Sequence, residues 1–442
     1  MELALPNRHA LAALCDASEK RTIMASQDIL DERGFKLWAR DQRVTPTLQQ
    51  RLLERKLKTP IESCLVAADG VTIFELHAQA QRFLGSNSPF ALGLRPWADE
   101  VCKAIQHLPL HSVAQLMLTT VQALRPHVFE HAVQSMVLSG AMAMHQGQER
   151  YHVRLALLGG LLHDLGEMYV NPEYLDQHSE LNSHRYRHVI VHPSFGALLL
   201  RRSTDYPATL ATGIAEHHER ADGSGYPKAL HSSQISELGQ HLGAVETICA
   251  LAQQTPNRHF WSQACLSMRV IPGEYGAAAL HFVSDLARKE STDSPAPGEP
   301  DCDAAERIQA LQQIDAHLSR VMDQADGLRL KTVSPGVKAV AGRVIQRLAN
   351  LRTAWNSAGL WAPEHLQNTA PVELDHLHRE LEFRCRAAYR DSVWQEHALS
   401  DRDYLQLEPL WRCLQAGAAD TETPVADTDL STAELSARAD GI

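Results

Sequence analysis

The chain has 442 residues, which at roughly 150 residues per domain is enough for two or three domains. Hydrophobic residues make up 44% and charged residues 21% of it, an ordinary globular composition that argues against a wholly disordered or fibrous chain. The formal net charge of −11 leaves no general basic surface for nucleic-acid phosphates, so we expect no binding to DNA.

The eight cysteines are scattered and form no Cys-x-x-Cys pair, which predicts reduced core cysteines in a cytoplasmic protein. Neither an export signal nor an apolar window of about 18 residues is evident, so no membrane span is expected. The chain has 24 histidines, many of them in its middle third. Candidate catalytic or metal-binding residues are therefore expected in this middle third.

Residues 1–110 form an N-terminal region that we expect to contain a small mixed unit near residues 22–66, without a recognisable function. Helical periodicity dominates residues 111–290. Within them, residues 153–165 are apolar nearly all round, which predicts a helix in the middle of a bundle rather than on its surface. The expected fold is therefore all-α, with a helical bundle at its centre.

Residues 291–303 are rich in proline and acidic residues, which predicts a linker at the end of the central domain. Residues 304–415 are amphipathic with helical spacing and predict a helical C-terminal region. Residues 416–442 are small, polar and mostly acidic, so we expect a disordered tail.

Potential metal ligands stand on successive predicted helices of the central region. They are His131, His163, Asp164, His192, His217, His218 and Glu246. Imidazole and carboxylate together suit iron, manganese or zinc. A buried, ionised Asp164 would be costly unless a cation compensated its charge. Five histidines and two acids are enough for two metal sites that share a bridging carboxylate.

Each of these residues also has an ordinary structural explanation when it is taken alone. A lone His131 is more often a core residue than a ligand, and His192 before Pro193 is an ordinary helix start. Glu246 by itself would usually be solvated or paired. The joint order of the set and its apolar setting favour the metal interpretation.

Three segments resemble the HD-GYP branch of the HD phosphohydrolases, bacterial signal-transduction enzymes that degrade cyclic di-GMP. They are GLLHDLGE at 160–167, HPSFG at 192–196 and HHERADGSGYP at 217–227, and the resemblance covers about residues 125–265. It implies an HD-type helical bundle with two iron or manganese ions. Asp164 would bridge them, with His131, His163 and Glu246 on one metal and His192, His217 and His218 on the other.

The same resemblance implies a reaction and partners. His163 and Asp164 would support a metal-bound hydroxide that hydrolyses cyclic di-GMP to pGpG, and whether GMP also forms is left open. Arg258 and Arg220 are candidates for substrate binding. The loop Gly225-Tyr226-Pro227 would contact a partner such as a diguanylate cyclase domain, and a homodimer is one expected form.

Several positions depart from the family pattern. Glu167 stands where the family has a lysine, and its carboxylate would repel a phosphodiester. Glu246 replaces an aspartate ligand, and Thr255 replaces the first arginine of a substrate-binding stretch. His127 stands where three-metal members have a glutamate, so two metals are predicted.

These departures keep an alternative open beside the enzyme, which the sequence favours. The alternative is a catalytically degenerate HD-GYP module that binds metal or cyclic di-GMP as a regulatory interaction protein. A third hypothesis is an HD phosphohydrolase that acts on another nucleotide.

Overall fold

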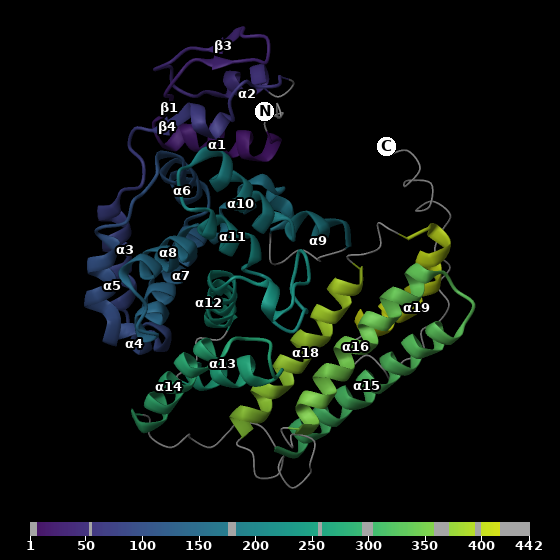
Figure 1. Cartoon of the computed structure of the whole chain (residues 1–442). Helices are drawn as coiled ribbons and strands as arrows, with labels where there is room; N and C mark the ends of the chain where they lie inside the picture. Colours follow the sequence, from purple (N-terminus) through teal and green to yellow (C-terminus); the bar gives the residue numbers. More distant parts are fainter. Residues whose placement is uncertain are drawn as a thin grey trace. The chain divides into compact units, whose positions relative to one another are not determined.

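The structure is a computed structural model that describes residues 7–52, 55–175, 183–254, 259–293, 304–357, 371–393 and 399–415. Its contacts divide the chain into two units, one of residues 1–299 with 350–358 and one of residues 300–349 with 359–442. The expectation of a mainly helical protein is confirmed, since the described strands are few and short (Figure 1). No helix within these described ranges is both long and apolar enough to cross a membrane.

The first part of the larger unit is mixed and has its own apolar core. Strand β1 (Ile23–Ala25) pairs antiparallel with β4 (Leu65–Ala67), and β2 (Ile29–Leu30) pairs with β3 (Lys36–Trp38). Three helical elements complete it: α1 (Arg8–Lys20), α2 (Pro46–Leu52) and the 3₁₀ helix η1 (Ile61–Cys64). The hydroxyl of Tyr169 donates a hydrogen bond of 2.6 Å to Glu62, which ties this part to the central helices.

The central helices share a second, larger core that runs from Val71 to Leu286. They are α3 (Ile73–Leu84), α4 (Pro89–Leu94), α5 (Ala98–Ile105), α6 (Ser112–Leu124), α7 (Pro126–His145), α8 (Arg150–Leu162), α10 (His192–Ser203), α11 (Ala208–Glu216), α12 (Glu237–Gln254), α13 (Phe260–Arg269) and α14 (Ala277–Asp293). The short helix α9 (Ser183–Val189) precedes α10 and contributes none of its described residues to this core. Short 3₁₀ helices lie between them, at η2 (Arg95–Trp97), η3 (His163–Tyr169), η4 (Pro172–Tyr174) and η5 (Ser232–Gln234).

Helix α8 lies inside the bundle, as its all-round apolar sequence predicts, because every residue from Leu155 to Leu162 is buried. The helix ends earlier than the pattern suggests. His163 and the following residues belong to η3 rather than to α8. Gly166 lets η3 lie against the start of α10, since a Cβ there would collide with the carbonyl oxygen of His192.

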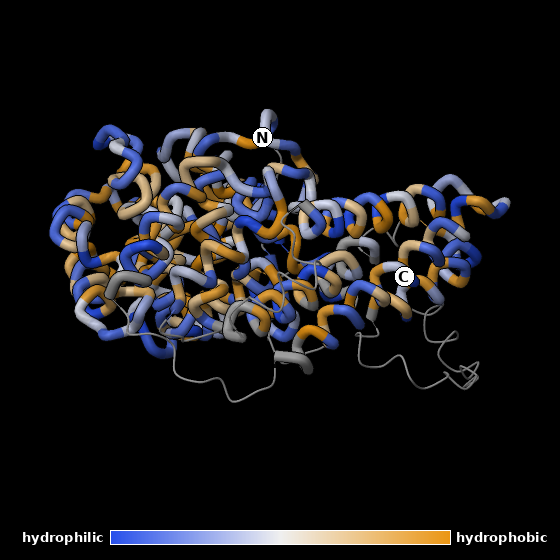
Figure 2. Tube along the Cα trace, turned by 90° about the horizontal axis from the view of Figure 1, so that it is seen from below, coloured by the Kyte–Doolittle hydropathy of each residue, from blue (hydrophilic) through white to orange (hydrophobic). Residues whose placement is uncertain are grey.

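The second unit contains four long helices in its described residues: α15 (Ala304–Leu330), α16 (Pro335–Ser357), α18 (Pro371–Val393) and α19 (Asp401–Gln415). The end of α16, from Asn350, is grouped with the larger unit. Hydrophobic positions recur along the helices with hydrophilic positions between them, the pattern of amphipathic helices (Figure 2). Residues 294–303 of the predicted linker lie outside the described residues, and so does the whole predicted tail, residues 416–442.

Candidate metal centre

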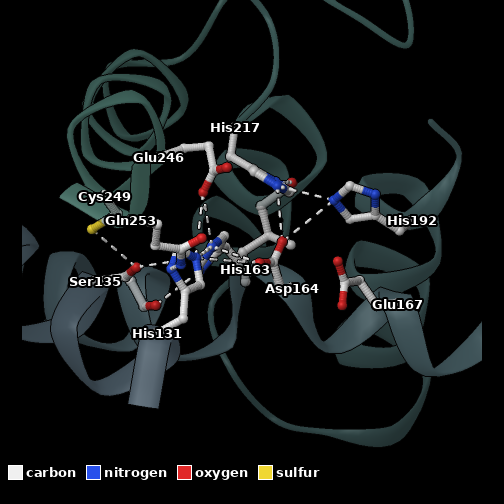
Figure 3. Close-up of polar contacts among 12 residues, drawn as sticks. His131, Ser135, His163, Asp164, Glu167, His192, His217, Glu246, Cys249 and Gln253 are labelled. Atoms are coloured by element: carbon white, nitrogen blue, oxygen red, sulfur yellow. Dashed lines mark hydrogen bonds and ion pairs between the residues drawn. The ribbon is translucent and has the colours of Figure 1, made fainter. Parts of the chain in front are cut away.

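The seven residues singled out in the sequence come together in two groups that share Asp164. In each group the potential ligand atoms lie within 4.8 Å of one another. One group is His131, His163, Asp164 and Glu246, and the other is Asp164, His192, His217 and His218. Both groups could hold a metal ion. Figure 3 labels all of these residues except His218.

Asp164 presents one carboxylate oxygen to each group. Its Oδ2 lies 3.1 Å from Nε2 of His163 and 3.5 Å from Nε2 of His131. Its Oδ1 lies 3.4 Å from Nε2 of His192 and 3.5 Å from Nε2 of His217. This is the arrangement that a bridging carboxylate between two cations requires.

Five elements supply these side chains. His131 lies on α7, and His192 begins α10, with Pro193 next to it as predicted. His217 and His218 follow the last residue of α11, and Glu246 lies on α12. His163 and Asp164 open η3, where the turn from α8 aims both side chains at the same point.

Backbone carbonyl groups orient three of the imidazoles. Nδ1 of His163, His192 and His217 lies 2.9, 2.7 and 2.6 Å, respectively, from the carbonyl oxygen of the residue three positions earlier. Each Nδ1–H therefore donates to the backbone, which leaves the lone pair of Nε2 directed at the cluster. Nδ1 of His131 lies 2.9 Å from the side-chain amide of Gln253.

The charges of the cluster fit a cation. Glu246 Oε2 is buried without a hydrogen-bond partner among the described residues, 3.3 Å from Nε2 of His163 and 3.6 Å from Nε2 of His131. Burial opposes ionisation, but the two imidazoles outweigh it and hold the pKa of Glu246 well below its usual range. Burial likewise opposes a charged His131, whose pKa is nevertheless raised to about 9 by the carboxylates of Asp164 and Glu246. Without a metal ion, protons on the imidazoles must therefore balance the negative charges of Asp164 and Glu246. A bound cation would balance these charges instead.

Glu167 lies beside this cluster, close to His192 and Asp164 (Figure 3). Its Oε2 lies 3.0 Å from Nη1 of Arg125, and both side chains are about four-fifths buried. Burial raises the pKa of Glu167, the charge of Asp164 adds to that rise, and Arg125 opposes it. The sequence analysis missed Arg125, although its place directly before the helix that carries His131 is a signal that could have drawn attention to it.

The loop after α11 fixes the orientation of His218. The ring of Tyr226 stacks on the His218 ring with centroids 4.5 Å apart and planes at 19°. The Tyr226 N–H donates to the carbonyl oxygen of His218 at 3.1 Å. Gly225 permits this fold of the loop, because a Cβ there would collide with the backbone of Glu219 and Arg220.

The remaining sequence candidates lie as follows. The Arg220 guanidinium donates to the carbonyl oxygens of His217 and Glu219, at 3.3 and 3.0 Å, and to the Thr247 hydroxyl at 3.0 Å. These contacts fix the loop, and substrate binding by Arg220 stays a prediction. His127 is exposed on α7 and belongs to neither group. Arg258 and Thr255 lie outside the described residues.

Comparisons with known proteins agree with this geometry. A family model described as HD domain matches residues 116–275. A cyclic di-GMP phosphodiesterase of Pseudomonas aeruginosa is 31% identical over 166 residues, 38% of this chain and 39% of that protein. A 3'3'-cGAMP-specific phosphodiesterase of Vibrio cholerae is 29% identical over 156 residues, 33% of this chain and 34% of that protein.

This chain thus spans about two fifths or less of the length of these two curated relatives. Among solved structures, an HDG"Y"P protein of Bdellovibrio bacteriovorus aligns with a TM-score of 0.33 and 15% identity, over 61% of this chain and 97% of that one. A TM-score and identity this low support no inference about the fold or function of this chain. The family match identifies residues 116–275 as an HD domain, and the His163-Asp164 pair and the Gly225-Tyr226-Pro227 loop within it support the resemblance to the HD-GYP branch.

Proposed function

We propose that this chain is a metal-dependent phosphodiesterase that hydrolyses cyclic di-GMP to pGpG, with further hydrolysis to GMP left open. The observation that carries the proposal is the position of Asp164, whose two oxygens face two separate sets of ligands. The curated relatives named for hydrolysis of cyclic dinucleotides support the substrate class. The catalytic domain would span residues 111–290.

Two divalent cations, iron or manganese, would be held by the two groups. When bound, they would supply an activated water and positive charge for in-line displacement at phosphorus. Asp164 would hold one oxygen toward each group. His131, His163 and Glu246 would complete one set, and His192, His217 and His218 the other.

The other parts of the site position these ligands. Backbone carbonyl groups hold the protons of His163, His192 and His217 on Nδ1, so that Nε2 is ready to ligate at neutral pH. Tyr226 keeps His218 in place by stacking. Arg125 offsets the charge of Glu167 where an anionic substrate would approach.

The test is hydrolysis of cyclic di-GMP by protein purified without oxygen and supplied with manganese or ferrous iron, followed by chromatography of the products. Asp164→Asn should abolish turnover. Asp99→Asn, at an exposed position on α5, is the matched control and should leave it unchanged. Turnover of Asp164→Asn at the wild-type rate would refute the proposed role of Asp164.

A second function, the degenerate regulatory module, is favoured by one observation, the carboxylate of Glu167 beside His192. On this hypothesis the wild-type protein binds cyclic di-GMP or metal without turnover, and Glu167→Lys creates turnover. A substrate panel that includes 3'3'-cGAMP separates both hypotheses from an HD phosphohydrolase with another nucleotide substrate.

We also propose that the protein works in the cytoplasm, as a homodimer, and that the loop at Gly225-Tyr226-Pro227 contacts a diguanylate cyclase domain. The stacking of Tyr226 on His218 would let such a contact act on a ligand of the site. Co-purification of a cyclase domain with wild-type protein but not with a Lys228→Glu variant at the rim of the loop would support this contact. Equal co-purification would exclude Lys228 from it.

A further inference from the structure

Two histidines and an aspartate meet at the far end of α7, outside the centre around Asp164. His145 is the last residue of α7, while His281 and Asp285 lie one turn apart on α14. Nε2 of His145 lies 3.3 Å from Nδ1 of His281 and 3.4 Å from Oδ2 of Asp285. Nδ1 of His281 lies 3.6 Å from the same Oδ2. The potential ligand atoms of all three residues thus lie within 4.8 Å of one another, close enough to bind one metal ion.

These separations match a small tetrahedral cation. Zinc binds imidazole nitrogen and carboxylate oxygen at about 2.0–2.2 Å, so adjacent ligand atoms of a tetrahedron lie about 3.3–3.6 Å apart. The three observed distances fall in this range. Three protein ligands of this kind leave a fourth position for water.

The cluster is separate from the centre around Asp164. His131 and His145 are fourteen residues apart on α7, which corresponds to about 21 Å along the helix axis. Only the Oδ2 of Asp285 faces the histidines, because its Oδ1 pairs with Arg288 on the same helix. The His145 and Asp285 side chains are 16% and 21% exposed and that of His281 is 68% exposed, so a cation could enter from solvent.

We propose that His145, His281 and Asp285 form a second, independent site for a divalent cation of the zinc class. The positive charges of Arg288 and Lys289 lie close by and would weaken the affinity. A bound cation would join the end of α7 to α14 and so hold α14 more firmly on the bundle. The site does not depend on the hydrolysis of any nucleotide.

The test is the zinc content of the full-length protein at equilibrium in dialysis against a range of free zinc concentrations. The variants are His281→Ala and Asp285→Asn, with His152→Ala at an exposed position on α8 as the matched control. Zinc taken up by the centre around Asp164 is common to all four proteins and cancels in the comparison. Wild type and the control should bind one more zinc per chain than the other two variants do.

Trp97 gives a second and local readout, since its ring meets the His145 ring edge-on with centroids 5.6 Å apart. Titration with cobalt(II) should quench tryptophan fluorescence in wild type and in His152→Ala. The quenching should be smaller in both His281→Ala and Trp97→Phe than in wild type, because quenching by cobalt at the centre around Asp164 is common to all of these proteins. Far-ultraviolet circular dichroism and nucleotide hydrolysis show whether each variant is folded.

If His281→Ala binds as much zinc as wild type at every concentration, and quenching is unchanged, the proposal is overturned and the cluster is a hydrogen-bonded group only. Unchanged hydrolysis in that variant would leave the proposed function of the Asp164 centre intact. Loss of hydrolysis by Asp164→Asn, in turn, says nothing against the second site, so the two proposals fail separately.

Discussion

Arg125 and Glu167 form a largely buried ion pair beside the candidate metal centre, with Nη1 and Oε2 3.0 Å apart. Glu167 by itself would repel a phosphodiester, and its ion pair with Arg125 compensates that negative charge. Arg125 comes from the turn before α7 and brings a positive charge to the same place. The local charge is therefore balanced rather than negative.

Replacing Arg125 should weaken substrate binding more than it slows chemistry. Arg125→Met leaves Glu167 without its cation, and we expect KM for cyclic di-GMP to rise about tenfold, equivalent to ~1.4 kcal/mol, with a smaller change in kcat. Glu167→Gln should lower KM. Steady-state kinetics with Arg154→Met, an exposed arginine on α8, as control would check both. An unchanged KM in Arg125→Met would remove this residue from substrate binding.

Metal content should distinguish the shared ligand from an unshared one. Because Asp164 faces both groups, Asp164→Asn should lower the affinity for both cations, whereas Glu246→Gln should affect mainly the group that contains His131. We expect about two manganese ions per chain in wild type, near one in Glu246→Gln and fewer than one in Asp164→Asn. Manganese analysis after gel filtration would measure this, and equal loss in both variants would contradict the bridging role.

Removal of metal should abolish turnover and lower stability together. The side chains of Asp164 and Glu246 are only 16% and 18% exposed, so a chelator leaves their negative charges to be balanced by protonated imidazoles alone. We expect EDTA to inactivate the protein and to lower its Tm, and manganese to restore both. Full activity after exhaustive chelation, with metal analysis confirming removal, would exclude the proposed mechanism.

Gly166 should tolerate no side chain, because a Cβ there would meet the carbonyl oxygen of His192. We expect Gly166→Ala to cost about 2–4 kcal/mol of stability and to displace Asp164 from His192, with loss of metal. Gly342→Ala on α16 is the matched control, since its Cβ would meet open space and should be neutral or stabilising. A Gly166→Ala protein with wild-type Tm and metal content would show that η3 can shift without penalty.

His241 should make stability fall in mild acid. It is buried on α12 with Nε2 3.1 Å from the carbonyl oxygen of Ser139, and burial lowers its pKa to about 4. Above the unfolded-state pKa of about 6.5 the imidazole is neutral in both states, so its contribution is fully present. As pH falls from about 6.5 toward 4, the unfolded chain binds the proton first, and about 3 kcal/mol is lost.

The measurement is the free energy of unfolding in urea at several pH values for wild type and His241→Gln. The glutamine amide can still donate to Ser139 but does not titrate. Wild type should lose stability relative to the variant by about 1.4 kcal/mol per pH unit below pH 6, while other titrating groups cancel in the difference. A difference that does not change with pH would show that His241 is not buried as a neutral group.

The sequence by itself determined the helical character of the central region and the choice of candidate metal ligands, which the structure brings together in two groups. All-round apolarity placed α8 inside the bundle, because only a buried helix lacks a polar face. The order of His131, His163-Asp164, His192, His217-His218 and Glu246 was enough to single out these residues, since few other reasons place so many ionisable groups in apolar helices.

Only the tertiary structure decided how these residues divide and what surrounds them. Which oxygen of Asp164 faces which histidine depends on the packing of η3 against α10 and of α8 against α7, and these contacts join residues far apart in the chain. The pairing of Arg125 with Glu167, and of His145 with Asp285, crosses 42 and 140 positions of sequence, respectively. No local pattern encodes such distances, because a side chain's partner is set by how helices pack and not by its neighbours along the chain.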